Sequence, residues 1–417
     1  MPIAVKPTST ETGFLAFFVA DALAMPVHWY YDIDAIKRDY SGWLTEYRAP
    51  RAAHPTSALS MASPSDSGKR PLRATATTTY AQPPVIGRLI LHDKLKYWNP
   101  AAPTTHYHQG MNAGDNTLNA LCSLRVAQAL GALGDGDAGV NDQRACQAAA
   151  LEAYVRFMTT PGTHNDTYAE PFHRAFYRDW DQAGRPTDAG RLLRFAERRR
   201  QMAFARPYED SSLATIGAIA MVVPFVLRCA DKSEEVAARQ ATDFAYLTNP
   251  VKSIGPCVDL YARALHAVAN GADTRATARR ALVSPPLGGK ALLKRIESME
   301  REIQLARAHR VVSERVLRLY QSCTWELGSS CAIAGALRTV FFLAYMFPNN
   351  LEAALLTNAN SGGENCHRGA ALGAFLGCAK QINAQPNPIP VHLVENLKSA
   401  REDILKTAPL YRNKANR

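Results

Sequence analysis

Residues 363–377 read GENCHRGAALGAFLG, and this stretch carries the pattern from which the fold can be predicted. A flexible glycine and two capping-type residues come first, which is typical of the start of a helix. Gly369, Gly373 and Gly377 then follow at four-residue spacing, so they share one face of that helix. Because glycine has no side chain, this face lets a neighbouring backbone approach closely. The stretch therefore predicts a buried helix packed tightly against another.

A similar turn precedes a second predicted helix. Residues 114–117 read GDNT, and apolar residues at helical spacing follow over 117–130. If the two helices pack together, their N-termini converge and offer unpaired N–H groups and positive dipole ends. The carboxylates there, Asp115 and Glu364, could then hold a hard cation or orient water, and the N–H groups could hold phosphate. The alternative is that both carboxylates only cap their helices.

Helical periodicity continues along the rest of the chain. Ala16, Ala20 and Ala24 form another small-residue stripe where a helix can approach. No alternating strand pattern of useful length competes, so we expect an all-α fold, a single compact domain of many helices. The predicted helices cover 11–24, 117–130, 146–159, 213–230, 238–247, 257–269, 292–320, 331–347, 366–382 and 391–407.

One domain is expected over residues 1–417, since the chain contains no clean linker and no tandem repeat. Residues 48–84 differ from the rest, because they are rich in Ser, Thr, Ala, Pro and Arg and have no hydrophobic period. A long segment of this kind inside a compact domain is usually a functional lid or is disordered. We expect a low-complexity loop or flap at about 48–84.

The composition limits the class of protein. The 417 residues include 48 Lys and Arg against 37 Asp and Glu, a net charge of +11, and 47% are hydrophobic. These values are typical of a globular protein. The positive charge is scattered and no nucleic-acid-binding module is recognisable, so we expect no nucleic-acid partner. A basic surface can equally attract a phosphorylated small molecule.

The sequence also bears on the compartment. No stretch has the roughly 20 uninterrupted apolar residues that a membrane span needs, so we expect no membrane partner. The apolar run 13–20 imitates a signal peptide, but Asp21 interrupts it before the supposed cleavage site. The eight cysteines include no CxxC pair, so neither a zinc site nor a disulfide framework is indicated. We expect a cytoplasmic protein.

Segment 13–28, with Asp21 and Pro26, resembles the opening motif of the ADP-ribosylglycohydrolases, a family that includes the dinitrogenase-reductase-activating glycohydrolase and the J-type crystallins. The second motif of that family, Thr-Asp-Asp-Thr, aligns with residues 114–117. Its C-terminal motif, Gly-Gly-Asp-x-Asp-Thr, aligns with residues 362–367. The order and the spacing match over almost the whole chain. The resemblance implies a single all-α domain with a central cleft.

In the family, these motifs supply the oxygen ligands of a two-magnesium site beside the ribose. Several of the ligand positions carry other residues in this chain, namely Gly114, Asn116, Cys366 and His367. Thiolate and imidazole suit softer metals than Mg²⁺. Asp115 and Glu364 remain as carboxylates, and Asp21 is a further candidate ligand. We therefore expect one weakly held divalent cation, Mg²⁺ or another, or none, rather than a full binuclear site.

The resemblance also indicates candidate catalytic residues. His28 stands where the family has a Glu near the reaction centre, and a histidine can act as general acid or base near neutral pH. Asp115 and Glu364 are expected to orient water or bind the cation. Cys366 is a candidate nucleophile, since a helix N-terminus lowers the pKa of a thiol. A buried, inert cysteine is the commoner state and remains the alternative.

Polar residues around these motifs are candidates for binding the substrate. Asn116 and Asn365 are expected to hold sugar hydroxyls, and loops on a rigid scaffold often bind ligands. The alternative for the loops is an ordinary surface or capping role. The expected substrate-binding residues are Asn116, Thr117, Gly363, Asn365, His367, His106, His108, His164, Asn165 and Asp166. Trp29, Tyr30 and Tyr31 could stack on a base or sugar, or belong to the core.

These features together predict a hydrolase of the ADP-ribosylglycohydrolase type. It would cleave an N- or O-glycosidic bond of a ribosyl, ADP-ribosyl or related sugar conjugate, carried by a small molecule or a modified protein. Such cleavage needs a stabilised oxocarbenium-like state and a water activated by a carboxylate or a metal. The alternative is a non-catalytic ligand-binding or structural, crystallin-like protein on the same scaffold, which the missing aspartates would also fit.

Overall fold

The computed structural model describes residues 8–57, 87–98, 104–134, 140–308, 313–379 and 388–412. Within these ranges the chain is helical, and its only β-contacts are two isolated bridges. The prediction of an all-α fold is therefore confirmed. The α-helices are α1 (Ser9–Ala24), α2 (Ile33–Asp39), α3 (Leu118–Ala132), α4 (Val140–Thr159), α5 (Pro171–Gln182), α6 (Ala189–Phe204), α7 (Gly217–Arg228), α8 (Glu234–Thr248), α9 (Gly255–Ala269), α10 (Thr274–Leu282), α11 (Gly289–Ala308), α12 (Ser313–Gly328), α13 (Ile333–Met346), α14 (Leu351–Ala359), α15 (Asn365–Gly377), α16 (Val391–Glu395) and α17 (Arg401–Thr407).

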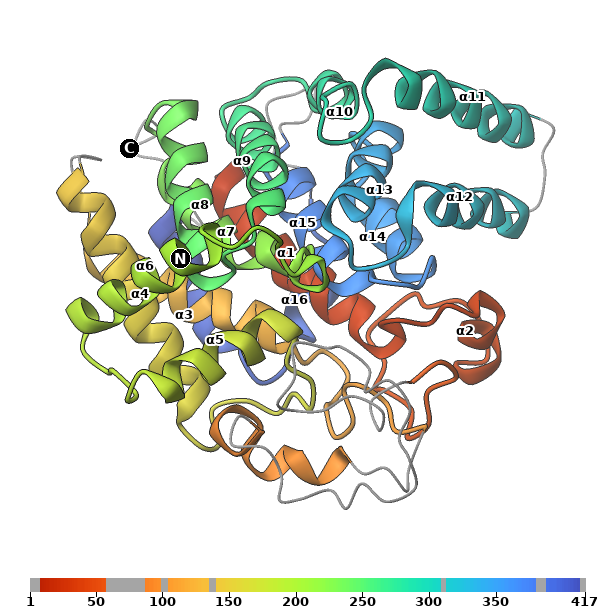
Figure 1. The fold of residues 1–417 in the computed structure, drawn as a ribbon. Coiled ribbons are helices and arrows are strands. Elements are labelled where there is room, and N and C mark those ends of the chain that lie inside the picture. The colour runs from red at the N-terminus through yellow and green to blue at the C-terminus, as the bar shows by residue number, and fades with distance from the viewer. Residues whose placement is uncertain are drawn as a thin grey trace, which may run out of the picture.

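Helices α1 and α15 pack against each other at the centre of the molecule (Figure 1). Their contact is made of small residues. A Cβ built on Gly373 would overlap the carbonyl oxygen of Ala16, and one on Gly377 would lie 2.8 Å from the Ala16 Cβ. Real Cβ atoms do not approach other atoms this closely, so both positions need glycine. The glycine stripe and the alanine stripe, each predicted as a surface where another helix can approach closely, thus pack against each other.

The remaining helices surround this pair. Helices α3, α7, α9, α13 and α14 contact α1 or α15, whereas α11 and α12 lie side by side at the edge of the molecule (Figure 1). Helix α7 is buried along its length up to Leu227, because its neighbours α3, α8 and α9 cover it on several sides. The core is thus several helices deep around α15.

The two ends of the described chain close on each other beside α1. Thr8 and Glu11 form a capping box at the start of α1. Arg412 lies 2.8 Å from Glu11, and the Tyr411 ring stacks on Phe14 at 4.8 Å between centroids. Ser9–Val27 is apolar and long enough to cross a membrane, yet 94% of this window is buried inside the structure. In this fold the segment is the central core helix.

Several element boundaries differ from the sequence prediction. The predicted helix 292–320 is divided between α11 and α12, and the predicted helix 391–407 is divided between α16 and α17. The second break has a clear cause, because the intervening chain binds the first glycine turn: Lys398 N donates to Gly114 O at 3.0 Å. Helices α2, α5, α6, α10 and α14 were not expected. Of the predicted flap 48–84, residues 48–57 are described and 58–84 lie outside the described residues.

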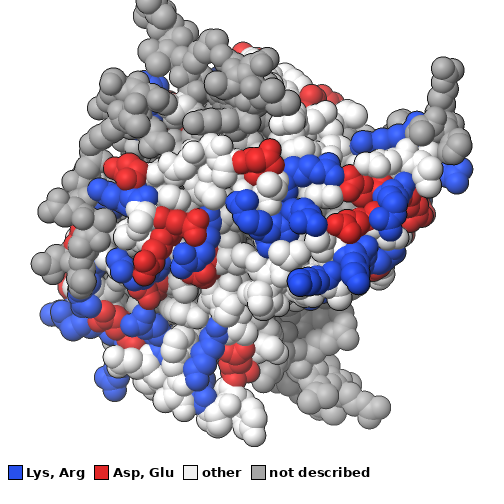
Figure 2. All heavy atoms as spheres, turned by 90° about the horizontal axis from the view of Figure 1, so that it is seen from above, with Lys and Arg blue, Asp and Glu red and all other residues white. Residues whose placement is uncertain are grey.

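Charges of both signs alternate over the face of the molecule in Figure 2. Surface charges of opposite sign also pair, as in the two-pronged contact of Arg295 with Glu326, in which both distances are 2.6 Å. The scattered charge expected from the sequence is what the face in Figure 2 presents.

Candidate functional site

His28 reaches the centre of the molecule because the chain turns sharply after α1. The short helix Met25–Val27 ends at His28, and Trp29 adopts a left-handed backbone with φ of 63°. This conformation is uncommon for a residue other than glycine and marks local strain. It is held by Trp29 N, which donates to Gly363 O at 2.7 Å, and by Gly363 N, which donates to Tyr30 O at 2.9 Å. Two distant motifs are thereby joined through their backbones.

The second glycine turn makes this junction tight. Gly362 and Gly363 have φ of 58° and 62°, and a Cβ on either would overlap a neighbouring carbonyl oxygen. Glu364 follows as the N-cap of α15, with its carboxylate accepting from His367 N at 3.3 Å. Its own N–H donates to Ser329 O at 2.8 Å. The carboxylate is therefore fixed at the start of α15, facing His28.

A chain of buried side chains starts from Glu364. His28 Nε2 lies 3.0 Å from Glu364 Oε1, and His28 Nδ1 lies 2.7 Å from His108 Nε2. His108 Nδ1 lies 2.7 Å from Asp166 Oδ1. All four residues are buried. Two carboxylates are thus connected through two imidazoles, an arrangement that can fix tautomers and move a proton.

The far end of this chain is anchored on α3. Asp166 accepts hydrogen bonds from Leu118 N at 2.7 Å and Tyr168 N at 3.1 Å, so it caps the first turn of α3. Burial alone would raise the pKa of Asp166, but His108 and the two N–H groups lower it overall. Burial disfavours the charged form of His28 and lowers its pKa to about 4, although the negative charge of Glu364 opposes this change. Asp166 is therefore a carboxylate and His28 a neutral imidazole near pH 7.

His367 lies between two glutamates. Its Nδ1 is 2.9 Å from Glu364 Oε1 and 3.7 Å from Glu170 Oε1. Burial opposes the charged imidazolium, yet the two carboxylates raise the pKa of His367 to about 10. Burial would also raise the pKa of Glu364, but His28 and His367 hold it well below its ordinary value. An ionised Glu364 therefore faces a protonated His367 near pH 7 in the metal-free centre.

Glu170 completes this centre and was not singled out as a site residue in the sequence. It precedes Pro171 at the start of α5, and Asn119 Nδ2 donates to its carboxylate at 3.0 Å. Burial, and secondarily Glu364, raise the pKa of Glu170, while His367 opposes the change. The available signal was an acidic residue directly before a helix-opening proline. Its partners come from three other parts of the chain, so its role could not be read from that signal alone.

The first glycine turn does not share this centre. Asp115 accepts hydrogen bonds from Asn112 N at 2.8 Å, from the Asn112 side chain, and from the hydroxyl and N–H of Ser399. Among the described residues, no hydrogen bond or ion pair joins it to Glu364. The expected pair of Asp115 and Glu364 is therefore not brought together. Asp115 holds the turn to the C-terminal segment instead.

Asp21 connects the first turn to α1. Its carboxylate accepts from Thr117 N at 2.8 Å, from Thr117 Oγ1 at 2.7 Å and from Asn116 Nδ2 at 3.0 Å. The Asn116 amide also donates to Phe18 O at 2.8 Å. Asp21 is buried, and burial raises its pKa. Asn116 and Thr117 thus contact the scaffold rather than open space.

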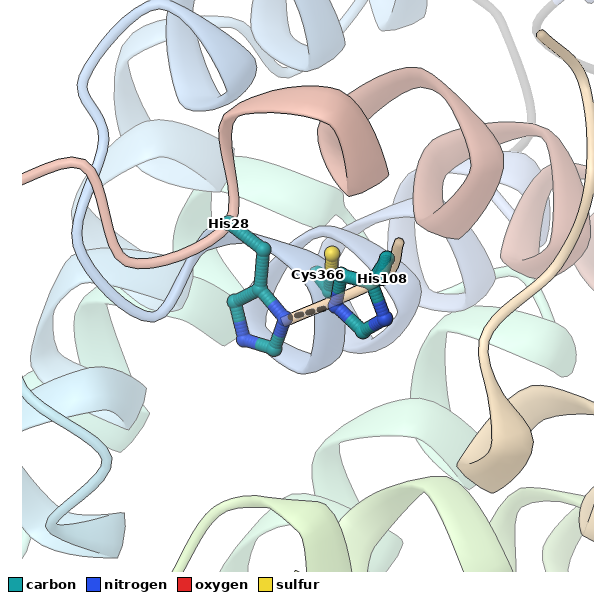
Figure 3. Close-up of side chains that lie close together, drawn as sticks. All are labelled: His28, His108 and Cys366. Carbon is teal, nitrogen blue, oxygen red and sulfur yellow. Dashed lines mark hydrogen bonds between the residues drawn. The ribbon is translucent and has the colours of Figure 1, made fainter. Parts of the chain in front are cut away.

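Cys366 is packed among these groups (Figure 3). Its sulfur lies near the ring nitrogens of His28 and His108, and its side chain is buried. Burial and the neighbouring carboxylates of Asp21 and Glu364 raise the pKa of the Cys366 thiol well above its ordinary value. This environment opposes the thiolate that a nucleophile needs. The structure therefore favours the inert alternative for this cysteine.

The remaining predicted residues divide into two groups. His106 and Asn365 are buried near the centre but hydrogen-bond to the backbone, His106 Nε2 to Pro26 O at 3.0 Å and Asn365 Nδ2 to Ala359 O at 2.9 Å. His164 donates to Ile90 O at 2.8 Å and Asn165 is exposed, so neither reaches the centre. His106 and His108, both predicted as substrate-binding residues, are buried.

Aromatic rings cover the centre. Trp29 stacks on His28 at 3.8 Å between ring centroids and makes edge contacts with Tyr107 at 4.6 Å and Tyr168 at 4.7 Å. Two partly exposed residues adjoin them: Tyr31, which is 36% exposed, and Cys331. Burial, Glu364 and Glu170 raise the pKa of Cys331 to about 12, so this thiol faces the carboxylates.

The hollows described on the surface lie elsewhere. The largest of these holds about 440 Å³ and lies between α5 and α6, where Arg178, Arg198 and Met202 line it. Since the aromatic rings are packed over Glu364 and His28, the centre is closed in this conformation. A substrate that reaches it must move some of these rings.

The residues present do not fit a pair of hard cations. Of the aligned ligand positions, Asp115 is bound to Asn112 and Ser399, and Asn116 turns its amide N–H groups toward Asp21. Cys366 and His367 replace oxygen ligands by sulfur and nitrogen, which Mg²⁺ disfavours. Two clusters could still hold one ion, namely His28 with His108 and Cys366, and His28 with Glu364 and His367.

Comparisons with known proteins were made over the whole chain. A family described as ADP-ribosylglycohydrolase matches residues 11–416. A solved structure titled "ADP-ribosylglycohydrolase-related protein complex" is 14% identical, covers 97% of this chain and 98% of its own, and has a TM-score of 0.45. No curated protein matches the sequence.

Proposed function

The chain belongs to the ADP-ribosylglycohydrolase family, and from that premise we propose that it is a hydrolase of a glycosidic bond. We place the reaction at the centre formed by Glu364, Glu170, His28 and His367. The bond is an N- or O-glycosidic bond of a ribosyl, ADP-ribosyl or related sugar conjugate. The observation that carries the proposal is the 3.0 Å contact of His28 with Glu364, backed by His108 and Asp166.

Glycoside cleavage needs one group that donates a proton to the leaving group and one that stabilises the sugar cation or activates water. Glu364 and Glu170 face the same His367 nitrogen, but the pKa of Glu364 is lowered and that of Glu170 is raised. Two carboxylates whose environments separate their pKa values suit an acid and a base. We assign Glu170 as the general acid and Glu364 as the carboxylate that orients water.

His28 is also linked to His108 and Asp166 by hydrogen bonds, a chain that we call the relay. Because Asp166 holds the Nδ1 proton of His108, the relay sets the orientation and tautomer of His28 beside Glu364. A neutral imidazole there can accept a proton from water and pass it along the relay. We therefore assign His28, which was predicted as an acid/base residue, as the general base and treat His108 and Asp166 as positioning residues.

Recognition of the conjugate is assigned to the aromatic cover. Trp29, Tyr107 and Tyr168 present ring faces and edges above the carboxylates, and aromatic rings stack on bases and sugars. The net charge of +11 favours a phosphorylated substrate. Free cysteines at all eight positions are compatible with action in the cytoplasm.

The alternative function is binding without turnover on the same scaffold. One observation favours it: the carboxylates lie beneath packed rings, with no described surface hollow leading to them. In that case the buried charges would only hold the fold together. The two functions differ in whether a conjugate is consumed.

Turnover by the full chain tests the proposal. ADP-ribose released from an arginine conjugate and from a serine conjugate would be measured for the wild type, Glu364→Gln and Asp115→Asn. We expect Glu364→Gln to lose at least about 100-fold in turnover, the usual contribution of a positioned acid or base, when it is assayed well below its melting temperature, which should fall because His367 loses a buried carboxylate partner. Asp115→Asn should keep turnover, because Asp115 contacts Asn112 and Ser399 instead.

Other outcomes count against hydrolysis. Wild-type turnover unaffected by Glu364→Gln would remove Glu364 from the reaction. Stabilisation by ADP-ribose without turnover of either conjugate would favour the binding function. A ligand at 100 times its dissociation constant adds about 2.7 kcal/mol of stability, which a melting experiment detects.

A further inference from the structure

Three potential metal ligands converge on one point of the buried centre. His28 Nε2 is 3.0 Å and His367 Nδ1 is 2.9 Å from Glu364 Oε1, and the donor atoms all lie within 4.8 Å of one another. Neighbouring ligands around one metal ion are roughly 3.0 to 3.4 Å apart when the metal–ligand bonds are about 2.1 Å. The distances are therefore those of adjacent ligand positions.

Polar atoms at this point lack partners. Glu364 Oε2 and both ring nitrogens of His367 have no hydrogen bond within the described ranges, although both side chains are at most 2% exposed. His367 Nδ1 is within ion-pair distance of Glu364 but outside hydrogen-bond geometry. Buried polar atoms are nearly always satisfied. Unsatisfied atoms clustered at one point indicate that a partner belongs there.

The proton positions of the relay indicate the charge of that partner. Asp166 accepts hydrogen bonds, so His108 Nδ1 carries the proton toward it, and His108 Nε2 accepts the proton of His28 Nδ1. A neutral His28 then points the lone pair of Nε2 at the Glu364 carboxylate, 3.0 Å away. In this tautomer a metal ion can bind both of these acceptor atoms. Histidines that bind metal are typically oriented by such a carboxylate relay.

We propose that His28 Nε2, Glu364 and His367 Nδ1 bind one divalent transition-metal ion, which displaces a proton from His367 to solvent, with Glu170 positioned to provide a further oxygen. Two imidazoles and one carboxylate suit Zn²⁺, Co²⁺ or Fe²⁺ better than Mg²⁺. The site thus differs in number and kind of ion from a pair of hard cations on oxygen ligands. The proposed metal site holds whether or not the protein is a hydrolase.

The competing cluster of His28, His108 and Cys366 is a weaker candidate. It would use the other nitrogen of His28, which already lies at hydrogen-bond distance, 2.7 Å, from His108 (Figure 3). An ion there would break the relay to Asp166. The thiol distinguishes the two clusters experimentally, because thiolate and imidazole ligands give different spectra.

Cobalt binding by the full chain tests the site without an activity assay. The purified protein is stripped with a chelator and titrated with Co²⁺ while visible absorption and heat are recorded. We expect one Co²⁺ per chain, with ligand-field bands and no thiolate charge-transfer band. Glu364→Gln and His367→Ala should abolish stoichiometric binding, and Cys366→Ser should keep it. His108→Gln should weaken binding by about 10- to 100-fold, the usual effect of removing a residue that orients a metal ligand.

Several results would overturn the site. These are no Co²⁺ binding, binding unchanged in Glu364→Gln and His367→Ala, a thiolate band, or full displacement of Co²⁺ by a modest excess of Mg²⁺. If a variant fails to fold, X-ray absorption of the Co²⁺-loaded wild type decides the matter alone. Scattering from two imidazole rings supports the site, and its absence excludes it.

Discussion

The two glycine turns look alike in sequence but do different work in the structure. Both place a glycine with positive φ and an acidic residue in front of a buried helix, α3 or α15. Asp115 accepts all its hydrogen bonds from Asn112 and Ser399, whereas Glu364 faces two histidines. Because the donors to Asp115 are neutral, this residue only holds the first turn in place. Imidazoles make the second turn a centre whose charge can change.

The pH dependence of stability should separate the turns most strongly. The pKa of His367 is raised to about 10 in the folded protein. Its contribution is therefore fully present below the unfolded value of about 6.5 and is lost as the pH rises through about 10. Each tenfold difference in proton affinity between the folded and unfolded states corresponds to about 1.4 kcal/mol, so the loss is on the order of a few kcal/mol.

The measurement is denaturant unfolding of the chelator-treated protein from pH 6 to pH 10.5. The free energy of unfolding of the wild type should approach that of His367→Gln as the pH rises. Asp115→Asn should follow the wild-type slope, because no histidine contacts Asp115 in the described chain. Exposed His392→Gln is the control for an ordinary histidine. A constant difference between wild type and His367→Gln would contradict the prediction.

Alanine at the turn glycines should give the next largest effect. Gly114 and Gly363 have φ of 86° and 62°, and an alanine Cβ would overlap Asn396 O or Ser329 O respectively. Backbone strain of this kind costs about 1–3 kcal/mol, and overlap adds to it. Both variants should melt lower.

The two glycine variants, Gly114→Ala and Gly363→Ala, should differ in Co²⁺ binding. Gly363→Ala also disturbs the Trp29 N to Gly363 O hydrogen bond, so it should weaken Co²⁺ binding. Gly114→Ala should bind Co²⁺ as the wild type does. Gly134→Ala, another glycine with positive φ but with open space around its Cβ, controls for backbone strain alone. Equal loss of Co²⁺ binding in both turn variants would contradict the inference that only the second turn belongs to the metal site.

Ser399→Ala should have the smallest effect. It removes the hydroxyl that donates to Asp115 but leaves the Ser399 N–H and Asn112 as donors. A typical hydrogen bond contributes about 0.5–1.5 kcal/mol, so the free energy of unfolding should fall by about that amount. Thermal and urea unfolding measure it, with turnover unchanged. Loss of turnover in Ser399→Ala would place the first turn in the active centre after all.

The fold could be predicted largely from the sequence because its determinants are local. Helical periodicity and four-residue stripes of glycine and alanine indicated that α1 and α15 are closely packed helices, since spacing along a helix determines which residues share a face, but not that they contact each other. Helices α5 and α6 were missed, since charged residues interrupt the apolar pattern of both and only four positions of α6 are buried. The break between α16 and α17 arises from contact with residue 114, which no local pattern contains.

The site was only partly predictable for a related reason. Glu364 and His28 were recognised, and the structure brings them together. Glu170 was overlooked, and Asp115 was paired with the wrong region, because both depend on contacts between segments far apart in the chain. Two acidic residues in similar local sequences can contact different parts of the fold. The local sequence does not show which distant segment each of them will meet.

The packing of α1 on α15 has a consequence for how the protein is made. Helix α1 leaves the ribosome early and finds its partner only after more than 300 further residues. At 5 to 20 residues per second, its apolar surface waits roughly 20 to 70 s for burial. During that time it is exposed to aggregation and to chaperones. N-terminal fragments that end before α15 should therefore be insoluble, and nascent chains should fold only after α15 has left the ribosome.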